Sequence, residues 1–236
     1  MTKLLGILGG MGPLASTEFL QTIYEFNFSD LEQDLPACIL FSDPTFPDRT
    51  KAVTSGNDEI LLEHLIKALS HLVQLGVSKI AISCITIHYF MPKIPIHLRK
   101  KVISLIDVIF KEVLTNQKRY LLLCTKGTCQ GGIFQNHQLW SLASQYIELP
   151  DEEDQNLIHQ LIYQIKIKNF DNSTLDYLKL LDTLTQKYQV EGMIAGCTEF
   201  HLITKYLIKS EQNNLNYNFI DPLLTIARDF QRLVNE

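Results

Sequence analysis

The chain has 236 residues, of which 46% are hydrophobic and 20% charged, a balance that provides a core for one large domain or two small ones. Its formal net charge of −5 argues against a nucleic-acid partner, because phosphate binding needs clustered Lys and Arg. No apolar run reaches the length of a membrane span. The apolar run at the N-terminus is short and interrupted by glycines, which does not match a signal peptide, so we expect a cytoplasmic protein.

Strand and helix patterns alternate along the first half of the chain. In order, we expect a strand over 3–10, a helix over 13–27, a strand over 37–43, a loop over 44–50, a helix over 57–75 and a strand over 77–83. Pro13 suits a first helical turn. Asn57 is the expected N-cap of the helix over 57–75, and Gly76 stops that helix.

The second half repeats the alternation. In order, we expect a helix over 98–116, a strand over 119–125, a loop over 126–132, a helix with a short strand over 140–150, helices over 151–169 and 176–189, a strand over 190–196 and a final helix over 223–235. Such alternation predicts an α/β protein with parallel-type sheets flanked by helices. Because the two halves resemble each other, we expect two similar lobes, the first formed by 1–98 with 208–236 and the second by 99–207.

Two cysteines occupy matching points of the two halves. Cys84 and Cys197 each follow an apolar strand, and each has a threonine just beyond it. Ligands of parallel sheets bind at the carboxyl ends of the strands, where both cysteines are expected. The total of five cysteines, with no CxxC pair, favours free thiols in a reducing compartment. Each cysteine alone could be a small core residue, but the matched pair favours acid/base or nucleophilic thiols.

A metal site is an alternative interpretation of the same residues. A histidine stands four positions after each cysteine, so that Cys84, His88, Cys197 and His201 form two C-x-x-x-H units. These could supply a Cys2His2 zinc site, but such ligand pairs usually come on tight turns rather than at strand ends. We therefore expect no metal, and packing or solvent-exposed roles for the two histidines.

The first glycine loop also allows two interpretations. Gly10, Gly12 and Ala15 follow a strand and precede a helix, as in a dinucleotide-binding fingerprint, with Asp43 as a ribose contact. Pro13 removes one amide beside the second glycine, which favours a turn that binds a small anion such as a carboxylate.

Two cations could hold a second carboxylate. Arg49 follows a strand and has the shape for a bidentate grip, although it could also pair with a neighbouring aspartate on the surface. Lys166 lies near the end of a helix, where it could bind a ligand or stabilise the helix dipole. Thr125 and Thr128 lie in a loop that suits anion binding or merely turns the chain.

Together, these segments resemble the aspartate/glutamate racemase family, which works without pyridoxal phosphate. The matching motifs, in chain order, are GGMGPLAST (9–17), SDPTFPDRT (42–50), SCITIH (83–88), TKGTCQGGIF (125–134), IYQIK (162–166), GCTE (196–199) and IDPLLTIARDF (220–230). GGMG, PDRT and GCTE in this order are quite specific, and the resemblance runs nearly end to end. It implies two α/β lobes with the active site in the cleft between them, and a homodimer.

The resemblance also implies a mechanism on a small amino-acid substrate. Cys84 and Cys197 would be the two acid/base groups, one on each face of the α-carbon, and no cofactor would be required. Arg49 and Lys166 would hold a side-chain carboxylate, which points to aspartate or glutamate. The substrate-binding residues that it implies are Met11, Gly12, Arg49, Ile85, Thr86, Thr125, Thr128, Lys166, Thr198 and Glu199.

One departure from the family pattern keeps other functions open. Ile85 replaces the asparagine that usually follows the first cysteine, and losing such a hydrogen-bonding group can cost about 1–3 kcal/mol. A cofactor-free decarboxylase or isomerase, which would need one cysteine, is therefore an alternative. A non-catalytic amino-acid binding protein is another.

Overall fold

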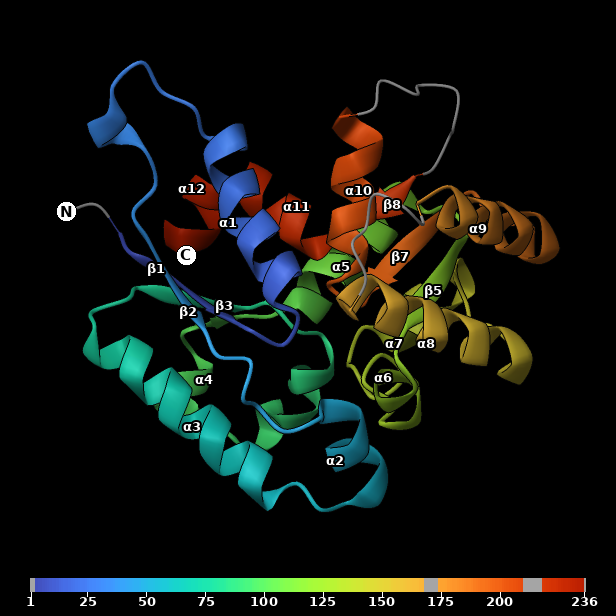
Figure 1. The fold of residues 1–236 in the computed structure, drawn as a ribbon, viewed down its shortest axis with the longest axis horizontal. Helices are drawn as coiled ribbons and strands as arrows, with labels where there is room; N and C mark the ends of the chain where they lie inside the picture. The colour runs from blue at the N-terminus through green and yellow to red at the C-terminus, as the bar shows by residue number, and fades with distance from the viewer. Residues whose placement is uncertain (1–2, 168–173, 210–217, 236) are drawn as a thin grey trace.

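The computed structural model describes residues 3–167, 174–209 and 218–235 and contains two parallel four-stranded sheets (Figure 1). The strands of the first sheet are β1 (Leu5–Gly9), β2 (Cys38–Ser42), β3 (Lys79–Ile82) and β4 (Val102–Ile103). Those of the second are β5 (Tyr120–Cys124), β6 (Ile147–Glu148), β7 (Gly192–Gly196) and β8 (Phe219–Ile220). The strand orders, β2-β1-β3-β4 and β6-β5-β7-β8, are equivalent, so the prediction of two similar α/β lobes is confirmed.

Helices cover both faces of each sheet. The α-helices are α1 (Pro13–Phe26), α2 (Arg49–Ser55), α3 (Glu59–Gln74), α4 (Ile96–Arg99), α5 (Leu105–Asn116), α6 (Lys126–Gln130), α7 (Trp140–Ala143), α8 (Glu152–Ile167), α9 (Thr174–Tyr188), α10 (Phe200–Lys209), α11 (Pro222–Arg228) and α12 (Phe230–Asn235). Three 3-10 segments, η1 (Glu32–Asp34), η2 (Thr86–Lys93) and η3 (Ser144–Tyr146), complete the described elements. None of the described helices combines the length and the apolar character that crossing a membrane needs.

The core is built from strands whose alternate side chains face opposite layers. Ile7 of β1 and Leu122 of β5 enter one shared core between the sheets, together with residues of α1, α5 and α11. Leu8 of β1 faces an outer layer formed with α3, and Leu121 of β5 faces another formed with α8 and α9. Figure 1 shows α3 on the outside of one sheet and α8 and α9 on the outside of the other. The shared core therefore joins the two lobes.

The structure corrects several of the expected elements. The helix expected over 98–116 begins only at Leu105, because the Ser104 hydroxyl caps it by accepting from the Asp107 amide, and β4 precedes it. The last helix is two, α11 and α12, which break at Asp229. Asp58, rather than Asn57, is the N-cap of α3.

Short elements also stand where loops were expected. The helices α2 and α6 begin inside the segments 44–50 and 126–132, and α10 was not anticipated by the sequence patterns. Part of the helix expected over 151–169 lies outside the described residues, since α8 ends at Ile167. The lobe boundaries at 98/99 and 207/208 remain a prediction. By strand pairing, β4 (102–103) joins the first sheet and β8 (219–220) the second.

Candidate active site

The two matched cysteines lie at equivalent points of the two sheets. β3 and β7 occupy the third place in their sheets, and Cys84 and Cys197 follow their carboxyl ends. Both are free thiols, about 5–6% exposed, and both line one cavity. The fold thus directs one thiol from each lobe toward a common space.

That cavity is narrow and polar. Its lining residues are Met11, Asp48, Arg49, Thr50, Cys84, Thr86, Thr125, Tyr163, Lys166, Cys197 and Glu199. Its volume of about 10 Å³ is close to what a single water molecule needs. An amino acid does not fit into this arrangement, so the elements around the cavity must move apart before a ligand of that size can enter.

Arg49 is the first residue of α2, and its guanidinium is held by backbone carbonyls. Nη1 donates to Phe46 O at 3.3 Å and to Pro47 O at 3.1 Å, and Nη2 donates to Met11 O at 3.1 Å. A guanidinium has five N–H donors. Within the part of the chain that the structure describes, at least two therefore remain for a ligand. The carbonyl contacts fix the plane of the fork.

Glu199 forms the electrostatic centre of the site. It is 2% exposed, and its Oε2 accepts a hydrogen bond from Cys197 Sγ at 2.7 Å. Its Oε1 lies 3.7 Å from Lys166 Nζ and has no hydrogen bond among the described residues. A Cβ at Gly12 would collide with this same oxygen, so the glycine makes room for the carboxylate.

The local charges favour a protonated Cys197 and a protonated Lys166. Burial raises the pKa of the Cys197 thiol, and the Glu199 carboxylate raises it further, while Lys166 opposes both. Burial by itself disfavours the Lys166 ammonium, but Glu199, Cys197 and Cys84 outweigh it and raise the pKa of Lys166. The Lys166 ammonium also lies 5.0 Å from the centre of the Tyr163 ring.

A cluster of threonine hydroxyls forms another part of the site. The hydroxyl oxygens of Thr86, Thr125 and Thr128 lie 3.0–3.1 Å from one another, at the starts of η2 and α6. Thr125 also caps α6 by accepting from the Thr128 amide. Hydroxyls can rotate to donate or accept, so the cluster can adapt to an anionic ligand.

Not every residue expected at the site reaches the cavity. Ile85 is 1% exposed and belongs to the shared hydrophobic core, so its side chain does not face a ligand there. Thr198 donates its hydroxyl to Ser83 O at 3.2 Å, and Thr128 and Gly12 lie directly behind the lining. The remaining expected residues line the cavity together.

Three lining residues were missed by the sequence interpretation. Asp48 caps α2 by accepting from the Lys51 amide, and Tyr163 donates to the same carboxylate at 2.8 Å, across the two lobes. Thr50 lies beside them. Tyr163 stands one helical turn before Lys166, so the helical spacing was a signal for it.

The two histidines of the C-x-x-x-H units do not converge. His201 Nδ1 lies 2.6 Å from Asp221 Oδ2, and its Nε2 lies 3.0 Å from Thr22 Oγ1, in the interior. His88 binds backbone groups near Cys84. Among residues 3–167, 174–209 and 218–235 there is no group of three metal-ligating side chains. The zinc alternative therefore has no ligand cluster in this region.

The dinucleotide alternative is also unsupported by the local geometry. Gly10 has φ 89°, and a Cβ there would collide with the Asp43 backbone, so the glycine is needed for a tight turn. The Asp43 carboxylate accepts from Thr45 and lies 2.9 Å from His64, so both of its oxygens already have partners.

Comparisons with known proteins agree with this architecture. The sequence model of a family described as Asp/Glu/Hydantoin racemase matches residues 8–229. RacX of Bacillus subtilis (strain 168), a broad specificity amino-acid racemase, is 25% identical over 211 residues, which cover 86% of this chain and 88% of RacX.

Solved structures share the fold. Picrophilus torridus aspartate racemase is 22% identical, with a TM-score of 0.78 over 99% of this chain and 100% of that one. An aspartate racemase homologue from Pyrococcus horikoshii OT3 is 20% identical, with a TM-score of 0.66 over 100% of both chains. The family match spans nearly the whole sequence and confirms the resemblance carried by its motifs: the chain belongs to the Asp/Glu/hydantoin racemase family.

Proposed function

We propose that this protein racemises an acidic amino acid, aspartate or glutamate, with Cys84 and Cys197 as the two acid/base groups and without a cofactor. The observation that carries the proposal is that these two thiols come from equivalent strands of opposite lobes and line one cavity with two cations. A two-base racemase needs that arrangement, because the proton leaves one face of the α-carbon and arrives at the other.

The hydrogen bond from Cys197 to Glu199 suggests the starting protonation state. Cys197 begins as a thiol, so it serves as the acid, and Cys84 is the base that takes the α-proton from the opposite face. After one turnover, Cys84 carries the proton and Cys197 is the thiolate. The same steps in reverse convert the other enantiomer.

The cations support an acidic substrate. The free donors of Arg49 suit a carboxylate, and a neutral side chain would leave them unpaired at a cost of about 1–3 kcal/mol. Lys166 is the second cation, although it also pairs with Glu199. The hydroxyls of the threonine cluster can bind a second carboxylate. These donors would also stabilise the charge that develops as the α-proton leaves.

Exchange of the α-proton with solvent tests the proposal. The protein is incubated in D2O with L-aspartate, L-glutamate and, because RacX is described as broad in specificity, a panel of neutral and basic amino acids. We expect deuterium at Cα and loss of optical activity with the acidic substrates, unaffected by carbonyl reagents that inactivate pyridoxal enzymes. No exchange with any amino acid would refute the proposal.

Cysteine variants separate the alternatives. Cys84→Ser and Cys197→Ser should each abolish racemisation, whereas Cys38→Ser, in β2 and outside the cavity, is the matched control and should retain it. A decarboxylase would release CO2 and survive one of the two changes. Calorimetric binding of an amino acid without exchange would indicate a binding protein.

A further inference from the structure

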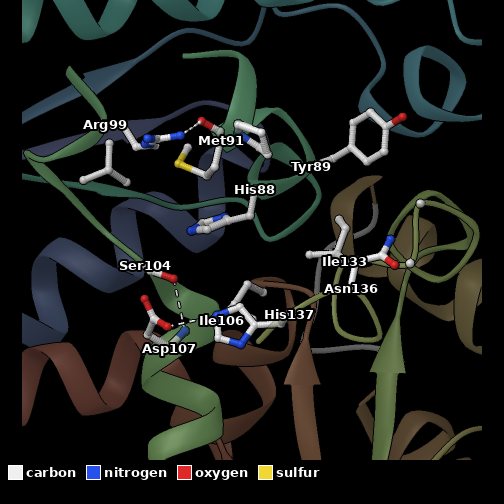
Figure 2. A pocket seen from close by; sticks show the side chains of 14 residues that line it. His88, Tyr89, Met91, Arg99, Ser104, Ile106, Asp107, Ile133, Asn136 and His137 are labelled. Carbon is white, nitrogen blue, oxygen red and sulfur yellow. Dashed lines mark hydrogen bonds and ion pairs between the residues drawn. The ribbon is translucent and has the colours of Figure 1, made fainter. Parts of the chain in front are cut away.

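A second, larger cavity lies behind Cys84, between the two lobes. Its volume is about 500 Å³, and η2, the start of α5 and the segment 131–137 line it. Figure 2 shows His88 projecting into its middle, between Met91 on one side and Ser104 and Asp107 on the other. His88 comes four residues after Cys84, so one side chain connects this cavity with the turn that carries the thiol.

His88 is hydrogen-bonded at both ring nitrogens. Its Nε2 lies 3.1 Å from the Leu105 amide nitrogen, and its Nδ1 lies 3.2 Å from the Cys84 carbonyl oxygen. A backbone N–H can only donate, so Nε2 must be the bare nitrogen of the ring and Nδ1 carries the hydrogen. The ring therefore donates from Nδ1 to the carbonyl of Cys84.

Each of the two contacts meets a specific need. Leu105 is the first residue of α5, and its amide is one of the donors that a helix start leaves without an intrahelical partner. The Cys84 carbonyl lies just past the end of β3, where the strand ladder no longer fixes the peptide plane. The histidine thus ties the turn at Cys84 to the rigid start of a helix.

We propose that His88 is a positioning residue for Cys84, fixing the peptide plane that follows the cysteine and thereby the direction of its thiol toward the first cavity. The inference rests on the proposed function, in which Cys84 exchanges a proton with the substrate. His88 is not among the residues that line the first cavity, so the role assigned to it is to position Cys84 rather than to react.

The protonation state of His88 is consistent with this role. Burial lowers the pKa of His88 to about 4, against the opposing effects of the backbone of Cys84, Ile85 and Ile103 and of the Asp107 carboxylate. The other charged or titratable residues that line its cavity are Tyr89, Arg99 and His137, and His137 pairs with Asp107 at 2.9 Å. His88 is therefore neutral near pH 7, as an acceptor for the Leu105 amide must be.

Two conservative variants separate the two contacts. The amide nitrogen of asparagine can occupy the place of Nδ1, and the amide oxygen of glutamine that of Nε2. His88→Asn keeps the donor to Cys84, whereas His88→Gln keeps only the acceptor for Leu105. We expect His88→Gln to lose about 10²-fold in kcat with little change in KM, since a small misplacement of a catalytic group has that effect, and His88→Asn to retain most of kcat. His137→Gln, in the same cavity without a contact to Cys84, is the matched control and should behave like the wild type.

Chemical rescue gives a second readout. The cavity beside His88 is large enough to admit imidazole once the side chain is removed. His88→Gly should therefore regain activity when imidazole is added, and the regain should follow the neutral form of imidazole. A folded His88→Gly variant that imidazole does not rescue would count against the inference.

The rate of alkylation of Cys84 relative to Cys197, followed by mass spectrometry, measures the position of the thiol without turnover. We expect this ratio to change in His88→Gln and to stay unchanged in His88→Asn and His137→Gln. Equal kcat values and equal alkylation ratios for the Asn and Gln variants would overturn the inference. If the wild type racemises nothing, the proposed function fails, and the alkylation ratio still decides whether His88 positions Cys84.

Discussion

Gly127 makes a close contact between the two lobes with Thr50, a residue that lines the first cavity. It lies on α6, and a Cβ there would stand 2.7 Å from Thr50 Cα on α2. In Gly127→Ala, the two helices must separate by about 0.7 Å to restore an ordinary contact of 3.4 Å. Overpacking of this kind costs about 1–3 kcal/mol. Alanine in turn favours the helix by about 1 kcal/mol, because Gly127 lies within α6 and is not one of the glycines with positive φ.

The cost should appear in substrate binding more than in stability. The lobes must part for a ligand to enter, but they must close again for Arg49, the neighbour of Thr50, to grip it. The new Cβ opposes that closure, so the ligand must work against it. If that costs 1–3 kcal/mol, KM for the acidic substrate rises by about 5- to 150-fold. Opening of the lobes relieves the clash in the free protein, so we expect the free energy of unfolding to change by less than about 1 kcal/mol.

Steady-state kinetics with aspartate and glutamate, together with urea unfolding, measure both effects. Gly76→Ala is the matched control, because its φ of 85° makes alanine strained while the new Cβ meets nothing within 4 Å. That control should lower stability and leave KM unchanged. A folded Gly127→Ala protein with wild-type KM would show that the contact between α2 and α6 does not govern binding.

Three further variants test the charges of the site and of the core. Glu199→Gln removes the carboxylate that raises the pKa of Cys197, so the alkaline limb of the kcat/KM profile should move to lower pH. Arg49→Lys keeps the charge and loses the planar fork, so KM for aspartate should rise by about 5- to 150-fold, with a smaller change for alanine. Asp221→Asn breaks the buried pair with His201 and should lower the free energy of unfolding at pH 7 by about 3–5 kcal/mol in urea. Burial opposes ionisation of Asp221, but His201 outweighs burial and lowers the pKa of Asp221 in the folded protein. The stability that this pair contributes is therefore present above pH ~3.9 and is lost as the pH falls through the pKa of Asp221 in the folded protein. Asp221→Asn should accordingly differ less from the wild type in acid.

The convergence of the two cysteines could be predicted from the sequence for a physical reason. Both follow apolar strands, and parallel strands present their carboxyl ends at one edge of a sheet. Because the two sheets have equivalent strand orders, β3 and β7 hold the same place in their sheets, and each cysteine follows the equivalent strand of its lobe. That both thiols line one cavity depends on the packing of the lobes, which only the resemblance to a known family suggested.

The direction of individual side chains was harder to predict. Ile85 follows a site cysteine directly, but its dihedrals are already helical at the start of η2, and its side chain enters the core. Asp48 seemed a surface partner for its neighbour Arg49, yet it receives the hydroxyl of Tyr163 from the other lobe. A contact between distant segments of that kind has no local sequence signal.

The two C-x-x-x-H units show how one spacing can serve different purposes. The first histidine, His88, acts on backbone groups beside its own cysteine. The second, His201, points away from its cysteine and pairs with Asp221, which caps α11. The two similar lobes therefore position their thiols differently. His88 contacts the backbone carbonyl of Cys84, whereas the Cys197 thiol itself donates a hydrogen bond to Glu199.

This asymmetry limits what kinetics can reveal about the two directions of a racemisation. Two enantiomers have equal free energies in water, so the equilibrium constant is one and kcat/KM must be equal in both directions, however unlike the two thiols are. A thiol held protonated by Glu199 favours one resting form of the enzyme, and that preference can change kcat and KM only in proportion. The Glu199→Gln variant should therefore alter the individual kcat values for the two enantiomers unequally while their kcat/KM values stay matched. Unequal kcat/KM values, measured with each enantiomer as a pure substrate, would mean that the measured reaction is not a simple inversion at the α-carbon.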